Sequence, residues 1–154
     1  MILFALMLGL PGQAPSTPEG SYAELNRDAL SHASSLSIDT ILSGLRATET
    51  GGRDVRGDAG RAIGPYQIHR AYFEDSGVQG IYSDCRDPEF ARRVVLAYWK
   101  RWCPDALENC DAQILARVHN GGPRGASKAG TLAYWRKFEQ QLILASARSW
   151  RVRD

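Results

Sequence analysis

Two carboxylates near a glycine-rich stretch have the clearest capacity for acid–base chemistry in this 154-residue chain. Glu49 continues the apolar stripe of a predicted helix and lies at its C-terminal end, where burial and the helix dipole both favour the protonated carboxyl. Asp58 lies in the glycine-rich stretch 50–64, a polar setting that favours the ionised form. Cleavage of a glycosidic bond needs such a pair, with one carboxyl protonated and the other ionised. We therefore predict that Glu49 is a general acid and that Asp58 is the nucleophile or the stabiliser of the cationic transition state.

Other interpretations of these carboxylates stay open. Asp54 is a rival for the second role, and either aspartate can simply cap a turn, which is a common use of Asp beside Gly. Glu49 can equally be a solvated residue at a helix end. Residues 56–58 spell Arg-Gly-Asp, an adhesion tripeptide, but a match of this length recurs by chance.

A series of predicted helices would position these residues. Ser37 is a good N-cap, and apolar residues follow it at helical spacing, at positions 38, 41, 42 and 45. This helix must end near Glu49, because Gly51-Gly52 supplies the left-handed residue of a C-terminal cap. The stretch 50–64 is expected to form a short hairpin or irregular loop. Further helices are predicted at 66–73, at 88–102, from 111 to a stop at 120–123, and at 130–147.

The composition and the aromatic spacing indicate one ordinary folded domain. The chain is 44% hydrophobic and 23% charged, which excludes collagen-like, coiled-coil and disordered classes. The expected fold class is α+β and mainly α. Four large aromatic residues at helical spacing are predicted to belong to its core: Trp99, Trp102, Tyr134 and Trp135.

Several motifs occur in a fixed order between residues 38 and 138: E-T-G-G at 49–52, I-G-P-Y-Q-I at 63–68, R-A-Y-F at 70–73, A-R-V-H-N-G-G-P at 116–123 and T-L-A-Y-W at 131–135. As an ordered set they resemble the invertebrate-type, or destabilase-like, lysozymes. The resemblance implies a lysozyme-like fold with a small β-hairpin after the first core helix. It also implies hydrolysis of the β-1,4 bond between N-acetylmuramic acid and N-acetylglucosamine in peptidoglycan, without a cofactor or metal. Glu49 matches the family's catalytic glutamate.

The chain departs from the family pattern in its loop and its cysteines. The loop is shorter than in the family, and Asp58 falls slightly off the position of the family aspartate. Gly52 and Ala126 stand where the family normally has cysteines. These departures affect the disulfide framework and leave the interpretation of Glu49 in place.

Residues beside the motifs are predicted to bind the sugar. Gln67 and Ile68 follow a Gly-Pro-Tyr turn and would form one wall of a cleft, with a tyrosine available for stacking. The helix stop after His119 would line the opposite wall through its exposed backbone groups. The alternatives are that Tyr66 and Ile68 are core residues and that the second segment is a plain helix stop. The predicted sugar-binding residues are Tyr66, Gln67, Ile68, Tyr72, His119, Asn120 and Gly121.

The first residues predict export. An apolar run at 2–10 is followed by Pro11 and by Gly-Gln-Ala, a pattern typical of a signal-peptidase site. The run is far shorter than the roughly 20 residues needed to span a bilayer. We expect a signal peptide at 1–14, a linker at 15–36, the catalytic domain at 37–147 and a basic tail at 148–154.

The cysteines and the charge constrain the location and the partners. Cys103 and Cys110 flank a proline-containing loop, so we expect them to form a disulfide in an oxidising compartment, with Cys85 left as a buried thiol. No cysteine pair has CxxC spacing, which makes a zinc site a poor interpretation. A net charge of +2 is too small to indicate a nucleic-acid partner. We expect a secreted or periplasmic monomer that acts on peptidoglycan glycan strands without inserting into membranes.

Three other functions remain to be distinguished. A lytic transglycosylase works with one glutamate and no aspartate, and a non-catalytic module would only bind glycan. An isopeptidase would have to use Ser127 and Lys128 with His119, and adjacent residues in a glycine-rich loop are weak geometry for a catalytic dyad.

Overall fold

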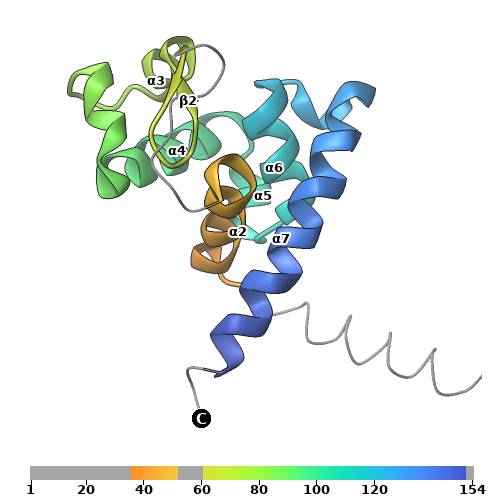
Figure 1. Cartoon of the computed structure of the whole chain (residues 1–154). Helices are drawn as coiled ribbons and strands as arrows, with labels where there is room; N and C mark the ends of the chain where they lie inside the picture. Colours follow the sequence, from red (N-terminus) through yellow and green to blue (C-terminus); the bar gives the residue numbers. More distant parts are fainter. Residues whose placement is uncertain (1–35, 52–60, 152–154) are drawn as a thin grey trace, which may run out of the picture. The chain divides into compact units, whose positions relative to one another are not determined.

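The computed structural model describes residues 36–51 and 61–151, with side chains through residue 146. This part of the chain is mainly helical with one small antiparallel hairpin, which confirms the predicted fold class (Figure 1). Asp54 and Asp58 lie outside the described residues.

Helix α2 (Ile38–Thr50) forms as its sequence predicts. The Ser37 hydroxyl accepts a hydrogen bond from the backbone N–H of Thr40 at 3.2 Å, which caps the first turn. Gly51 ends the helix in the left-handed conformation, at φ 63°. Ile41, Leu42 and Leu45 of the apolar stripe are buried, so the same helix face directs Glu49 toward the interior.

The hairpin lies later in the chain than we predicted. Strand β1 (Ala62–Ile63) pairs with β2 (Ile68–His69), with Ile63 opposite Ile68. Helix α3 (Arg70–Ser76) begins only after this pairing, so the prediction of a helix over 66–73 is wrong at its start. Gln67 has φ 48°, a left-handed conformation that interrupts a right-handed helix, and the N–H of Gln67 closes a turn on the carbonyl of Gly64 at 3.1 Å.

Helices α4 (Pro88–Trp102) and α6 (Ala112–Gly121) begin where their N-cap residues predict. Asp87 accepts a hydrogen bond from the N–H of Phe90 at 2.7 Å, and Asp111 accepts one from the N–H of Ile114 at 3.0 Å. A short helix after the Cys103 turn and three 3-10 turns were not predicted. The elements after α3 are η3 (Tyr82–Arg86), α4 (Pro88–Trp102), α5 (Pro104–Glu108), α6 (Ala112–Gly121), η4 (Gly125–Ser127), η5 (Ala129–Thr131) and α7 (Leu132–Arg151).

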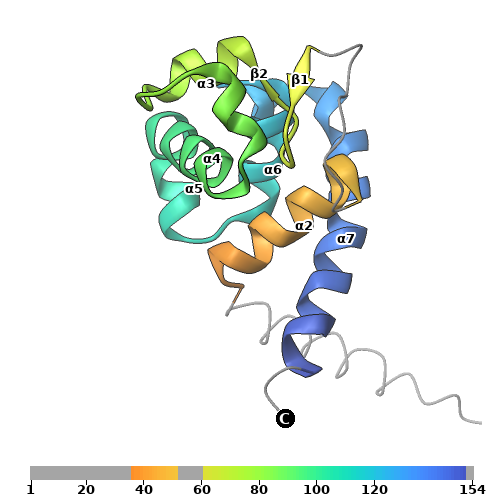
Figure 2. The same cartoon turned by 60° about the vertical axis from the view of Figure 1, so that its left-hand side comes forward.

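The core lies among α2, α4, α6 and α7. Helix α2 packs along α7, and Figures 1 and 2 show the two helices side by side in both views. Trp99 and Phe138 are fully buried, and Trp135 is partly buried against the same core. Trp102 is 37% exposed, so its predicted place in the core is wrong. It is the last residue of α4, and its ring is covered by the guanidinium of Arg101 at 5.0 Å instead.

The three cysteines are free thiols in the structure. Cys85 is fully buried, as predicted, and burial raises the pKa of its thiol to about 11. Cys103 and Cys110 are partly buried and do not form the expected disulfide in this structure.

Gly64 fixes the hairpin turn against η3 by close backbone contact. A Cβ atom on Gly64 would lie 1.8 Å from the carbonyl oxygen of Cys85, far inside van der Waals contact. Gly77 has a similar positive φ, 70° against 75°, but a Cβ there would meet nothing within 4 Å. An alanine at either position would strain the backbone, but only an alanine at Gly64 would also overlap a neighbouring atom.

We predict that Gly77→Ala lowers the free energy of unfolding by about 1 kcal/mol, the cost of a left-handed alanine. Gly64→Ala carries the same strain and must also push η3 away from the hairpin, so it should cost at least about 2 kcal/mol more. Chemical denaturation of both variants measures the difference. Equal decreases in the free energy of unfolding would show that η3 can move away from the hairpin at no cost and that Gly64 does not fix the turn.

Candidate active site

Glu49 lies in the last turn of α2, and its side chain is 18% exposed. Two threonines bind backbone carbonyls in this turn: the Thr48 hydroxyl donates to the carbonyl of Gly44 at 2.8 Å, and the Thr50 hydroxyl donates to that of Arg46 at 3.1 Å. Both carbonyls lie inside the helix, so the two hydroxyls add side-chain bonds four residues back along α2 and stay bonded within the helix. The Glu49 carboxyl is thus held on a rigid element, mostly withdrawn from water but still reachable by it.

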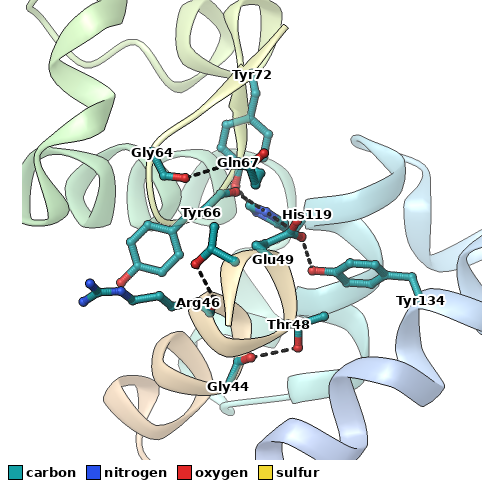
Figure 3. Close-up of polar contacts among 11 residues, drawn as sticks. Gly44, Arg46, Thr48, Glu49, Gly64, Tyr66, Gln67, Tyr72, His119 and Tyr134 are labelled. Carbon is teal, nitrogen blue, oxygen red and sulfur yellow. Dashed lines mark hydrogen bonds and ion pairs between the residues drawn. The ribbon is translucent and has the colours of Figure 1, made fainter. Parts of the chain in front are cut away.

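Tyr134, from the first turn of α7, is the closest polar partner of Glu49 among the residues that the structure describes. Its hydroxyl donates a hydrogen bond to Glu49 Oε1 at 2.5 Å (Figure 3). Burial, the charge of Glu49 and this hydrogen bond together raise the pKa of Tyr134 well above its ordinary value. The phenol therefore stays protonated and acts as a donor throughout the neutral range.

His119, near the end of α6, lies on the other side of Glu49 (Figure 3). Its Nε2 is 3.0 Å from the backbone carbonyl of Tyr66, and its Nδ1 is 3.1 Å from the hydroxyl of Tyr72. A carbonyl can only accept, so Nε2 carries the proton and Nδ1 accepts from Tyr72. Nε2 is also 3.7 Å from Glu49 Oε1, beyond a normal hydrogen bond.

Burial lowers the pKa of His119, although the nearby Glu49 charge and the bond to the Tyr66 carbonyl partly oppose this. The ring is therefore neutral at neutral pH, and its contact with Glu49 is then not an ion pair. A permanent cation at this position would hold Glu49 ionised, whereas a neutral ring leaves the carboxyl able to take up and release a proton. The arrangement suits proton transfer by one carboxyl group.

Of the residues predicted to bind sugar, Tyr66, Gln67, Tyr72 and His119 lie around Glu49 in Figure 3. Tyr66, Ile68 and Tyr72 are buried, and the Tyr72 ring stacks on Tyr98 with centroids 3.6 Å apart. Ile68 is fully buried, which agrees with the core alternative for this residue. Contact of these three side chains with a sugar stays a prediction.

The remaining predicted residues lie in the hairpin turn and in the last turn of α6. Gln67 is partly buried, and its side-chain amide donates to the carbonyl of Gly64 at 2.9 Å, inside the hairpin turn. Asn120 is exposed, and Gly121 ends α6 with its carbonyl accepting from the Lys128 ammonium at 2.5 Å. Sequence reasoning did not identify Tyr134, which it assigned to the core. Its place in the T-L-A-Y-W motif was the available signal.

The residues of the isopeptidase alternative do not form a catalytic dyad in the structure. Both ring nitrogens of His119 are occupied by Tyr66 and Tyr72, and the ring is buried. Lys128 is bound to the backbone of Gly121. Nothing in this arrangement activates Ser127 as a nucleophile.

Comparison with known proteins identifies relatives of this fold and site. Residues 40–141 match the family model described as Destabilase. A lysozyme of Magallana gigas is 42% identical over 82 residues, covering 52% of this chain and 60% of the relative. The invertebrate-type lysozyme 6 of Caenorhabditis elegans is 34% identical over 87 residues, covering 48% of this chain and 62% of the relative. The chain thus spans about three fifths of the length of these curated relatives.

Solved structures agree with the same assignment. The Meretrix lusoria lysozyme, crystallised in complex with Aeromonas hydrophila PliI, is 32% identical with a TM-score of 0.58, covering 68% of this chain and 89% of that chain. The Tapes japonica lysozyme is 30% identical with a TM-score of 0.56, covering 64% of this chain and 85% of that chain. With Glu49 at the end of a buried helix and the family model matched over residues 40–141, this chain belongs to the Destabilase family.

Proposed function

We propose that this protein is a muramidase that cleaves the β-1,4 bond between N-acetylmuramic acid and N-acetylglucosamine in peptidoglycan, with Glu49 as the general acid. The observation that carries the proposal is the Glu49 carboxyl itself, 18% exposed, bonded to the Tyr134 hydroxyl and beside a neutral imidazole. Similarity to proteins named lysozyme supports the choice of substrate.

In this reaction protonated Glu49 gives its proton to the glycosidic oxygen as the bond to the sugar ring breaks. The neutral state of His119 supports this role, because the carboxyl is then not locked in an ion pair. A second carboxylate is required to meet the positive charge on the sugar ring, and we assign it to Asp58. Asp54 is the alternative for this position.

The same proposal includes the glycan contacts and the location of the protein. Gln67, Asn120 and Gly121 are offered as polar contacts for the sugar, because Gln67 lies in the hairpin turn and Asn120 and Gly121 end α6, the helix that carries His119. We propose a secreted or periplasmic monomer with a signal peptide at 1–14, a linker at 15–36, a catalytic domain at 37–147 and a basic tail at 148–154. Helix α7 continues to Arg151, so that tail would overlap the last helical turns. No helix within residues 36–51 and 61–151 is long and apolar enough to cross a membrane.

We predict that Glu49→Gln abolishes lysis of cell walls while leaving the fold intact. Glutamine keeps the shape and can still accept the hydrogen bond from Tyr134, but it has no proton to give. General-acid catalysis typically contributes about a hundredfold to ten-thousandfold in rate, so turbidity assays should show a loss in that range. Glu139→Gln, at an exposed position of α7, is the matched control and should keep full activity. A loss smaller than about tenfold in Glu49→Gln would remove the general-acid assignment.

A second prediction concerns the products and Asp58. A second carboxylate close to the sugar ring lets water complete the reaction, so wild-type digestion should release reducing muramic ends with retained configuration. A lytic transglycosylase would instead release 1,6-anhydro ends, which are lighter by one water. Mass spectrometry of the soluble muropeptides separates the two outcomes, and mainly anhydro products would replace the muramidase proposal with the transglycosylase.

The matched pair Asp58→Asn and Asp54→Asn assigns the second carboxylate within this prediction. We expect the first variant to lose most activity and the second to keep it, since each change removes one charge and preserves side-chain size. The reverse pattern would show that Asp54 holds the role.

The buried neutral state of His119 predicts a pH dependence of stability. Its pKa in the folded chain is below the ordinary value of 6.5, so the unfolded chain binds the proton first as the pH falls. The stability contributed by neutral His119 is therefore complete above about pH 6.5 and is lost progressively as the pH falls through the folded-state pKa. In His119→Gln, whose amide can still donate to Tyr66 and accept from Tyr72, urea unfolding between about pH 7 and pH 5 should show a shallower loss. His69→Gln should make the loss only slightly shallower, because the charge of His69 is a minor contributor to the lowered pKa of His119. Identical slopes in wild type and His119→Gln would contradict the neutral assignment.

A further inference from the structure

Tyr134 approaches Glu49 in a way that the general-acid role alone does not explain. The hydroxyl of Tyr134 donates to one specific oxygen, Oε1, at 2.5 Å, and the other carboxyl oxygen is left without this donor. Tyr134 is only partly buried as a residue, so its position is not explained by core packing alone. A carboxyl oxygen that accepts a hydrogen bond from a phenol is the poorer place for the acid proton, because that proton would compete with the donor.

The start of α7 is held by a polar cluster, which gives the phenol a defined position. Thr131, directly before α7, is buried, and its hydroxyl lies 2.8 Å from the carbonyl oxygens of both Gly125 and Lys128. Arg117 of α6 donates to the Thr131 hydroxyl at 2.9 Å and to the carbonyl of Lys128 at 3.0 Å. The helix that carries His119 is thereby tied to the helix that carries Tyr134, and both side chains are placed relative to Glu49.

We propose that Tyr134 is a positioning residue for Glu49: its phenol binds Oε1, directs the acid proton to Oε2 and stabilises the carboxylate that forms when this proton leaves. The inference rests on the proposed function of Glu49 as the general acid. During proton transfer the proton moves from Oε2 to the glycosidic oxygen, and the phenol keeps its own proton throughout. The hydrogen bond becomes charge-assisted only as Glu49 ionises, so it favours the transition state over the ground state.

The electrostatic surroundings allow this role to be read from a pH profile. Among the residues that the structure describes, Tyr134 of α7, His119 of α6 and Tyr72 of α3 interact electrostatically with Glu49. His69 of β2 acts in turn on His119. Burial raises the pKa of both tyrosines and lowers that of His119, so all three side chains are neutral at neutral pH. A change in the alkaline limb of activity then reports on Glu49.

The test is Tyr134→Phe, which removes the hydroxyl and keeps the ring. We expect turnover on soluble peptidoglycan oligomers to fall about tenfold, with little change in KM, because the loss is of a transition-state interaction. The alkaline limb of the pH–rate profile should move up by about one pH unit, because the ionised form of Glu49 has lost a hydrogen-bond donor. Tyr98→Phe removes the hydroxyl of a buried tyrosine that is not bonded to Glu49 or His119, and as the control it should show neither effect.

A measurement that needs no catalysis accompanies this test. The side-chain carboxyl carbon of Glu49 is followed by NMR through a pH titration in the wild type and in Tyr134→Phe, and the midpoint should be higher in the variant. An unchanged midpoint, or a drop in turnover with an unchanged alkaline limb, overturns the inference and leaves Tyr134 a packing residue. Failure of the proposed function is a separate result, because it appears as a wild-type protein that releases no muropeptides while the titration still responds to Tyr134.

Discussion

The hydrogen bond between Tyr134 and Glu49 is the interaction on which the described site depends. A carboxyl group that is 18% exposed at the negative end of a helix has lost most of its hydration, and it needs a donor that does not add charge. Only an element from elsewhere in the chain can bring that donor, because the last turn of α2 presents carbonyl groups rather than N–H groups. The packing of α2 along α7 therefore buries apolar side chains and also brings the Tyr134 hydroxyl to Glu49.

The apolar core brings the helices together, and polar contacts set how they are aligned. Burial of Ile41, Trp99 and Phe138 would tolerate small shifts along the helix axes, since hydrophobic attraction is not directional. The bonds of Arg117 to the segment before α7, and of His119 to the Tyr66 carbonyl, have fixed geometry and short range. The hairpin and both site helices are thus held in register by buried or partly buried polar groups.

Prediction from the sequence succeeded where the cause was local. The ends of α2 and α4 follow from Ser37, Gly51 and Asp87, whose caps act within one turn of the chain. It failed where a distant partner decided the outcome: the residues at 66–69 form a turn and a strand because Ile68 pairs with Ile63 and because Tyr82 donates to the Ile68 carbonyl at 2.7 Å. Glu49 was found from its place on an apolar stripe, but Tyr134 is 85 residues away, and apart from its place in the T-L-A-Y-W motif nothing in its helix distinguishes it from a core aromatic.

Desolvation gives the site a common electrostatic character. It raises the pKa of Tyr72 and Tyr134 and lowers that of His119, so the same physical cause keeps an acid and a base in their neutral forms. Hydrogen bonds then give these neutral groups direction: Tyr72 and the Tyr66 carbonyl fix the tautomer of His119, and Tyr134 faces Oε1 of Glu49. A site built with a lysine or arginine beside Glu49 would be more polar but would hold the carboxyl ionised, which is the wrong state for giving a proton. Burial of aromatic and imidazole groups around one carboxyl therefore achieves orientation without charge, and this is the property that a general acid requires.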